Sequence, residues 1–150
     1  MKNNKLLISL LSLPLLATPF VAIADDDNVP PIKSLIVLEE CGACHLAFQP
    51  AFLPKASWQK MMGELENHFG EDASLDADSI TEIEDYLVAN ASRQKFRGDK
   101  APQRITELRW FKKEHNDSEV RFMENKYKVK SLVDCAACHQ GAEMGIYDDD

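Results

Sequence analysis

The chain has few cysteines, histidines and glycines, fewer basic than acidic residues, and no long apolar run, and the last two shortages exclude classes of protein. It contains four cysteines, four histidines and six glycines in 150 residues, and its acidic residues outnumber its basic ones, for a formal net charge of −8. An acidic surface repels nucleic-acid phosphates and favours a basic protein partner. No stretch approaches the ~20 consecutive apolar residues of a membrane-spanning helix. These shortages argue against a nucleic-acid-binding or membrane-spanning protein.

Residues 1–24 have the pattern of a secretory signal peptide. A basic start at Lys2 and Lys5 precedes a short apolar run that ends in Ala22-Ile23-Ala24, a small-residue cleavage site. A retained membrane anchor is the weaker interpretation, because the run is short and two prolines interrupt it. We expect cleavage after Ala24, a soluble monomer in the periplasm and no membrane span in the mature chain.

All four cysteines fall in two copies of one motif, Cys41-Gly42-Ala43-Cys44-His45 and Cys135-Ala136-Ala137-Cys138-His139. C-x-x-C-H is the attachment pattern of c-type haem, in which the thiols add to the two vinyl groups and the histidine binds the iron. The sequence therefore predicts two covalent haem c groups. The thioether residues would be Cys41, Cys44, Cys135 and Cys138, and the proximal iron ligands His45 and His139.

Other uses of the cysteines fit less well. An exported chain with four cysteines could form two disulfides, but a disulfide framework does not explain a histidine directly after both pairs. Zinc could bind such cysteines and histidines, although export and the doubled motif disfavour it. A thioredoxin-like dithiol would need a βαβ pattern around the C-x-x-C, and the sequence shows none.

Two haems need two distal ligands, and two further histidines remain, His68 and His115. The simplest assignment pairs His45 with His68 and His115 with His139, because imidazole is a good iron ligand. Methionine ligation or an open position at one iron are the rivals. The candidate sulfurs belong to Met61, Met62, Met123 and Met144.

Apolar periodicity predicts helices and no strands. The first expected helix is Ile32–Glu40, with Pro31 in its first turn. The second is Trp58–Phe69, with Ser57 as its N-cap and Gly70 at its end, and the third is Ala77–Ala91, with Asp76 or Asp78 as its N-cap. Further helices are expected at Arg104–Glu114, in a short continuation to Phe122, and from Ser131 into the second motif. Residues 147–150 read as a mobile acidic tail. The polar segment 92–102 reads as a linker with a boundary near Gly98, so the expected domains are 25–98, carrying haem 1, and 99–150, carrying haem 2.

Nearly all of the expected mature chain resembles one family, the small dihaem cytochromes c of the DHC type. The resemblance rests on both motifs together with the segments Leu53-Pro54, Ser57-Trp58, Asn67-His68-Phe69-Gly70-Glu71, Tyr86-Leu87-Val88-Ala89-Asn90-Ala91, Arg104-Ile105-Thr106, Trp110-Phe111, Glu114-His115, Val129-Lys130-Ser131 and Gly141-Ala142-Glu143. It implies a mostly α fold, with a class I cytochrome c-like domain followed by a smaller, irregular haem domain. It also implies two bis-histidine irons, His45 with His68 and His139 with His115.

The family donates electrons to a small oxygen-binding c-type haem protein, the sphaeroides-type haem protein, through an electrostatic contact. The resemblance thus implies a one-electron carrier, not an enzyme, that receives electrons from a membrane or soluble donor. The alternative is a dihaem enzyme or gas-binding protein, peroxidase- or reductase-like, with one open or labile axial site. That alternative would need an acid–base group near the iron, and the sequence offers no clear candidate.

Overall fold

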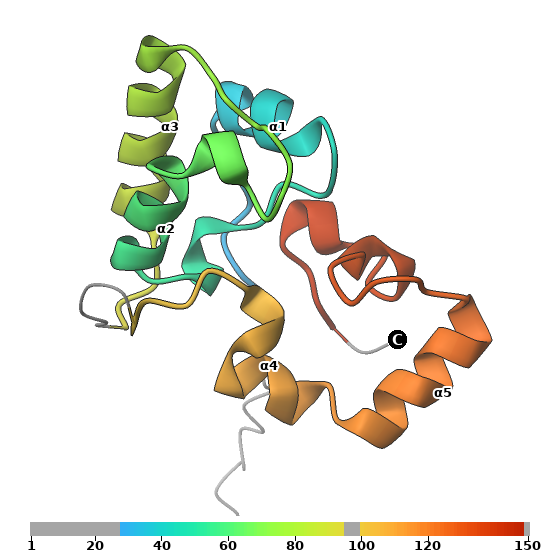
Figure 1. Cartoon of the computed structure of the whole chain (residues 1–150). Coiled ribbons are helices and arrows are strands. Elements are labelled where there is room, and N and C mark those ends of the chain that lie inside the picture. The colour runs from blue at the N-terminus through green and yellow to red at the C-terminus, as the bar shows by residue number, and fades with distance from the viewer. Residues whose placement is uncertain (1–27, 95–99, 149–150) are drawn as a thin grey trace, which may run out of the picture.

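The computed structural model describes residues 28–94 and 100–148, which form short helices joined by loops (Figure 1). The α-helices are α1 (Leu35–Gly42), α2 (Lys55–Met62), α3 (Ala77–Asn90), α4 (Arg109–Glu114) and α5 (Asp117–Tyr127). The 3-10 helices are η1 (Pro50–Phe52), η2 (Leu65–Asn67), η4 (Ile105–Glu107), η5 (Cys135–Ala137) and η6 (Ala142–Met144). Within the described ranges there are only two isolated bridges and no strand, so the predicted mostly α fold is confirmed. None of the helices in these ranges is long and apolar enough to cross a membrane.

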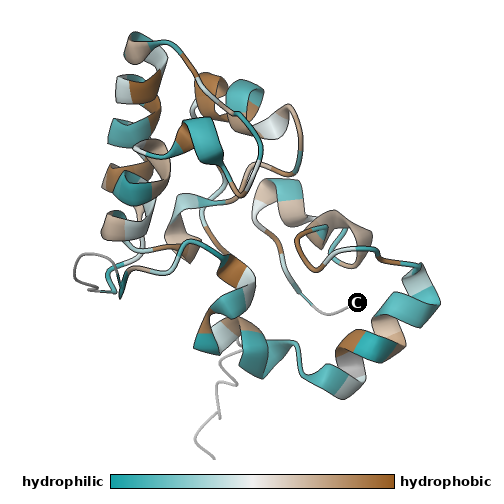
Figure 2. Cartoon of the chain, viewed as in Figure 1, coloured by the Kyte–Doolittle hydropathy of each residue, from teal (hydrophilic) through white to brown (hydrophobic). Residues whose placement is uncertain are grey.

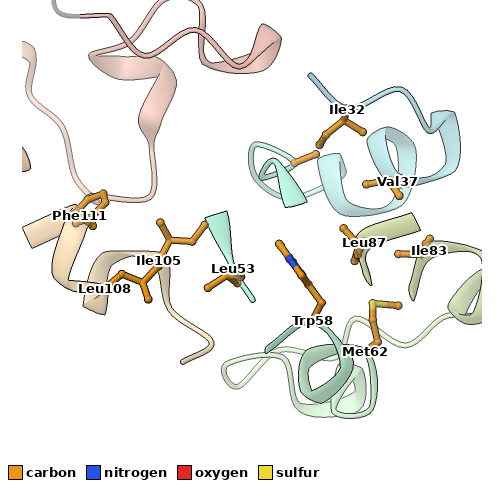
Figure 3. Packing of buried hydrophobic residues seen from close by; sticks show 11 residues of the cluster. Ile32, Val37, Leu53, Trp58, Met62, Ile83, Leu87, Ile105, Leu108 and Phe111 are labelled. Carbon is orange, nitrogen blue, oxygen red and sulfur yellow. The ribbon is translucent and has the colours of Figure 1, made fainter. Parts of the chain in front are cut away.

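The hydrophobic core lies where α2 and α3 pack against each other and against α1 (Figure 3). Ile83 and Leu87 lie one turn apart on α3, and both are almost fully buried. Leu53 lies between this cluster and the buried side chains of η4 and α4, so the core extends into the second half of the chain. A continuous core of this kind fixes the halves relative to each other.

Helix α3 begins where the sequence predicts. Asp76 is its N-cap, and the carboxylate accepts hydrogen bonds from the backbone N–H groups of Asp78 and Ser79 at 3.1 and 3.0 Å. This is the usual way to satisfy the free N–H groups of a helix start. After the helix, the N–H of Ser92 donates to the carbonyl oxygen of Leu53 at 2.9 Å. This bond ties the end of α3 to the loop that follows the first motif.

The predicted starts of the first two helices are wrong. The first begins at Leu35, with Ser34 as its N-cap, and Pro31 lies before it. The second begins two residues before Ser57, because the carbonyl of Pro54 already accepts hydrogen bonds from the N–H groups of Ser57 and Trp58. Ser57 is therefore a buried residue inside α2 and not its cap.

The predicted extent of the second helix is also wrong. Gly63 ends α2 after Met62, and the chain continues through the 3-10 helix η2. The apolar periodicity does not reveal this break: Leu65 still packs against the core, but Phe69 at the end of the pattern is 46% exposed. His68 therefore directly follows the 3-10 helix η2 as its C-cap and begins a turn, instead of ending an α-helix that runs from Trp58.

The second half is more irregular than the sequence predicts. The expected helix Arg104–Glu114 is split into η4 and α4, while α5 extends beyond the predicted end at Phe122 to Tyr127. No α-helix leads from Ser131 into the second motif, where a turn is followed by the single-turn helix η5. Figure 2 shows that α5 is mainly hydrophilic, and its Phe122 side chain is 61% exposed.

Two predictions fall on residues that the structure does not describe. The signal peptide of residues 1–24 and the boundary near Gly98 both lie outside the described residues. The mobile tail predicted from Tyr147 onwards is partly wrong, because Tyr147 is half-buried and hydrogen-bonded to the first half of the chain.

Candidate haem sites

The structure brings His45 and His68 together although different segments supply them. Their ring centres are 6.2 Å apart, and the ring planes are inclined by 23°. His45 follows the end of α1, and Phe48 stacks behind its ring at 5.1 Å. This arrangement is the one that the sequence predicts for the first haem.

A tight turn directs His68 towards His45. The N–H groups and carbonyls of His68 and Glu71 bond reciprocally, at 2.8 and 3.2 Å, around Phe69 and Gly70. Both central residues have positive φ, 56° and 105°. This conformation is natural for glycine but uncommon for phenylalanine. The guanidinium of Arg104 lies 4.1 Å from the centre of the Phe69 ring and helps to hold it there.

The structure pairs His115 with His139 in the same manner. Their ring centres are 6.0 Å apart, but the planes are inclined by 76°. His115 follows the last residue of α4, and its ring stacks on Phe111 at 4.1 Å with an angle of 7°. His139 follows η5, and its N–H donates to the carbonyl of Cys135 at 2.8 Å. Each motif histidine therefore faces one of the two remaining histidines.

Both spacings fit an iron between the rings. Two imidazoles that bind one metal from opposite sides, each at about 2.0 Å, have ring centres roughly 6.3 Å apart. The separations of 6.2 and 6.0 Å match this value closely. Directly stacked rings would be much closer, as His115 and Phe111 are at 4.1 Å. The residues present therefore fit a six-coordinate haem iron at each pair.

Backbone carbonyls orient one ring of each pair. Nδ1 of His45 lies 2.7 Å from the carbonyl oxygen of Leu46, and Nδ1 of His115 lies 3.1 Å from that of Phe111. A proton on Nδ1, donated to such a carbonyl, leaves Nε2 free to bind a metal. Burial, with smaller contributions from His45 and Arg104, lowers the pKa of His68, which favours the neutral ring that a metal requires.

The four cysteines are not paired in disulfides. Burial raises the pKa of Cys41 and Cys138, and raises that of Cys135 to about 11. A reactive dithiol needs a lowered pKa, so this environment does not suit thiol–disulfide chemistry. Within the described ranges, no group of three or more His, Cys, Asp and Glu side chains forms a metal cage. A tetrahedral zinc site therefore has no support among these residues.

The methionines described below are placed less favourably than the histidines to act as distal iron ligands. Met62 is buried in the core and Met144 is 62% exposed on η6. Met61 packs against the core and lines a cavity of about 270 Å³ beside His68, so it lies near the first pair. The ring of His68, however, lies at the spacing from His45 that fits an iron between them.

Sequence reasoning missed a group of residues that joins the two halves. Gln49 is fully buried, and its amide bonds with Ala142 and Tyr147. The ring of Phe52 contacts those of Trp110 and Tyr147. A glutamine inside the apolar segment 46–54 was a usable signal, because a polar residue between buried neighbours must find a partner. Its partner could not be inferred from the sequence.

The comparisons with known proteins agree with this geometry. The family model described as dihaem cytochrome c matches residues 37–147. The solved structures that resemble the chain include two of a dihaem cytochrome c from Rhodobacter sphaeroides. One is 46% identical, with a TM-score of 0.67, and covers 77% of this chain and 98% of its own. The other is 43% identical, with a TM-score of 0.70, and the match covers 79% of this chain and 99% of the other chain.

A dihaem cytochrome c from Shewanella baltica is 38% identical, with a TM-score of 0.66, and covers 76% of this chain and 86% of its own. No curated protein matches the chain. The family carries two haem c groups and supports a role in electron transfer, so the cofactor prediction is confirmed. Because the family model matches residues 37–147 and the three solved relatives are 38–46% identical, the chain belongs to the dihaem cytochrome c family.

Proposed function

We propose that the protein is an exported one-electron carrier in which both irons are six-coordinate with two histidines each. His45 and His68 would bind the first iron, and His115 and His139 the second. The thioether bonds would be made by Cys41, Cys44, Cys135 and Cys138. The observation that supports this most directly is the spacing of the paired rings, 6.2 and 6.0 Å.

The haem groups, when bound, supply reversible one-electron chemistry between the ferrous and ferric states. His45 and His68 would hold the first iron, and His115 and His139 the second, which would leave neither iron a position for a substrate. Imidazole pairs favour a lower reduction potential than a methionine–histidine pair does. The carbonyls behind His45 and His115 fix the orientation of those rings and raise their basicity. The tasks of the chain would therefore be to hold the haem groups, to orient the histidine rings and to set the reduction potentials.

The remaining expectations belong to the same proposal. Cleavage after Ala24 would release a monomer into the periplasm. There it would take electrons from a membrane or soluble donor and pass them to a small oxygen-binding c-type haem protein. Residues 25–98 would form the haem 1 domain and residues 99–150 the haem 2 domain. The signal-peptide pattern of residues 1–24 supports export. The resemblance to the family supports the two domains and the acceptor, and the net charge of −8 supports an electrostatic contact with a basic partner.

The test is the optical spectrum of the reduced holoprotein before and after carbon monoxide is added. A six-coordinate bis-histidine iron offers no free position, so we expect neither haem spectrum to shift. A shift at one haem would reveal an open or labile axial position. That result would replace the electron carrier with the peroxidase-, reductase- or gas-binding alternative.

A further inference from the structure

We propose that the loop after the first haem motif completes the second haem site. Gln49 and Phe52 of this loop, together with Tyr147 near the C-terminus, form what we call the interhaem clasp. It acts as a positioning device for His139 and His115, and so for the second haem relative to the first. The inference rests on the proposed ligation of the second iron.

The polar half of the clasp is a buried amide that joins distant segments. Gln49 is fully buried, and its Nε2 donates to the carbonyl oxygen of Ala142 at 2.7 Å. The hydroxyl of Tyr147 lies 2.5 Å from Oε1 of Gln49 and 3.3 Å from the same carbonyl of Ala142. A buried amide is costly unless it is hydrogen-bonded. Separation of the segments would leave Gln49 unsatisfied, so these bonds hold η6 against the loop.

The aromatic half connects the clasp to His139. The ring of Tyr147 lies edge-on to that of His139, with centres 5.4 Å apart and planes at 63°. On its other side, Tyr147 meets the ring of Phe52 edge-on at 5.1 Å and 69°. Tyr147 therefore lies between the proximal ligand of the second haem and a residue of the first half. Its hydroxyl is fixed by Gln49, so the position of its ring is fixed as well.

The same phenylalanine also reaches the other ligand of the pair. The rings of Phe52 and Trp110 lie 5.5 Å apart, and those of Trp110 and Phe111 lie 5.9 Å apart. The ring of Phe111 is stacked on His115. Aromatic contacts therefore run from Phe52 to both histidines of the second pair. Those histidines come from different segments, and Phe52 is the point at which their supports meet.

Backbone packing closes the arrangement around Gly145. The N–H of Val29 donates to the carbonyl oxygen of Gly145 at 2.8 Å. Gly145 has a φ of 79°, and a Cβ there would collide with the backbone oxygen of Val29. Because the loop of Gln49 and Phe52 begins next to His45, the clasp links the ligand environment of the first iron to that of the second. Electron transfer between the haems requires a fixed separation between them.

The test compares variants of the full holoprotein. Tyr147→Phe removes only the hydroxyl of the clasp. Tyr86→Phe is its matched control, because the Tyr86 hydroxyl also bonds across the chain, accepting from the N–H of Lys33 at 2.8 Å. Phe52→Leu disrupts the aromatic half without removing a polar group, and Phe122→Leu on the exposed face of α5 is its control. Both clasp variants keep all ligands and thioether cysteines.

We expect both clasp variants to keep two haems but to hold the ligands of the second haem less firmly. Loss of a residue that orients a metal ligand typically costs about tenfold or more in metal affinity. Carbon monoxide should therefore shift the spectrum of the reduced second haem in the clasp variants, under conditions in which the wild type shows no shift. One of the two reduction potentials should also shift, while the controls match the wild type.

Two failures can be told apart. If the wild type already binds carbon monoxide at the second haem, the proposed bis-histidine ligation is wrong. If the wild type resists carbon monoxide and the clasp variants behave like it at both haems, with unchanged potentials, the clasp proposal alone is wrong. Loss of the second haem in Phe52→Leu would support the clasp if Phe122→Leu retains it.

Discussion

The ring centre of each histidine in this chain lies about 6 Å from that of one other histidine, and the proposed ligation rests on this pairing of residues. The sequence predicts the proximal pair, because C-x-x-C-H places a histidine next to two thiols. It also indicates His68 and His115, since few other side chains can bind iron. The clasp residues Gln49 and Tyr147 could not be predicted as partners, because their contact depends on how distant segments pack.

Replacement of His115 by methionine should raise one of the two reduction potentials and leave both haems attached. A thioether ligand favours the ferrous state more than imidazole does. His68→Met is the matched variant and should raise the other potential. Potentiometric titration with optical detection checks both. If both potentials in His115→Met equal those of the wild type, His115 is not a ligand.

At the scale of elements, the sequence predicts a helix accurately where a capping residue and regular apolar spacing mark it, and poorly elsewhere. Helix α3 was predicted almost to its ends, because Asp76 caps it and its apolar residues recur with helical spacing. The turn at His68 was missed, since a left-handed phenylalanine is not a pattern that periodicity reveals. The second motif lies in turns and single-turn helices, where local propensity is weak and tertiary contacts determine the conformation.

Substitution of Gly145 by alanine should destabilise the protein. Its positive φ and the nearby oxygen of Val29 leave no room for a Cβ, so the contact between the C-terminal segment and residue 29 must open. We expect a loss of about 1–3 kcal/mol in the free energy of unfolding, measured by chemical denaturation of the holoprotein. Gly63→Ala is the control, because its φ is −79° and a Cβ there would lie in ordinary contact, 3.5 Å from the backbone oxygen of Gln59. Equal stabilities of the two variants would contradict the packing described for Gly145.

At the scale of the whole molecule, charge is unevenly distributed. Helix α3 carries acidic residues and no basic ones, whereas α4 and α5 carry most of the basic residues of the described helices. Most of the net charge of −8 falls on residues 1–98, which hold 14 acidic and 8 basic residues, against 11 and 9 in residues 99–150. The sequence shows this asymmetry directly, but not that the core and the clasp join the two halves of the chain next to the paired histidines.

Complex formation with a basic haem protein should weaken as salt rises, because ions screen contacts between exposed charges over about 8 Å at physiological ionic strength. Glu82→Lys on α3 should weaken the complex more than Glu124→Lys on α5, although both change the net charge equally. Affinity measured at several salt concentrations tests this. Affinities that do not respond to salt would show that the contact is not electrostatic.

The central claim is that four histidines fill the axial positions of two irons, and the electron paramagnetic resonance spectrum of the oxidised holoprotein tests it most directly. We predict two low-spin ferric signals of equal weight. They should differ in shape, because the ring planes are inclined by 23° at one site and by 76° at the other. A high-spin ferric signal would mean that one iron lacks its second histidine and would contradict the account.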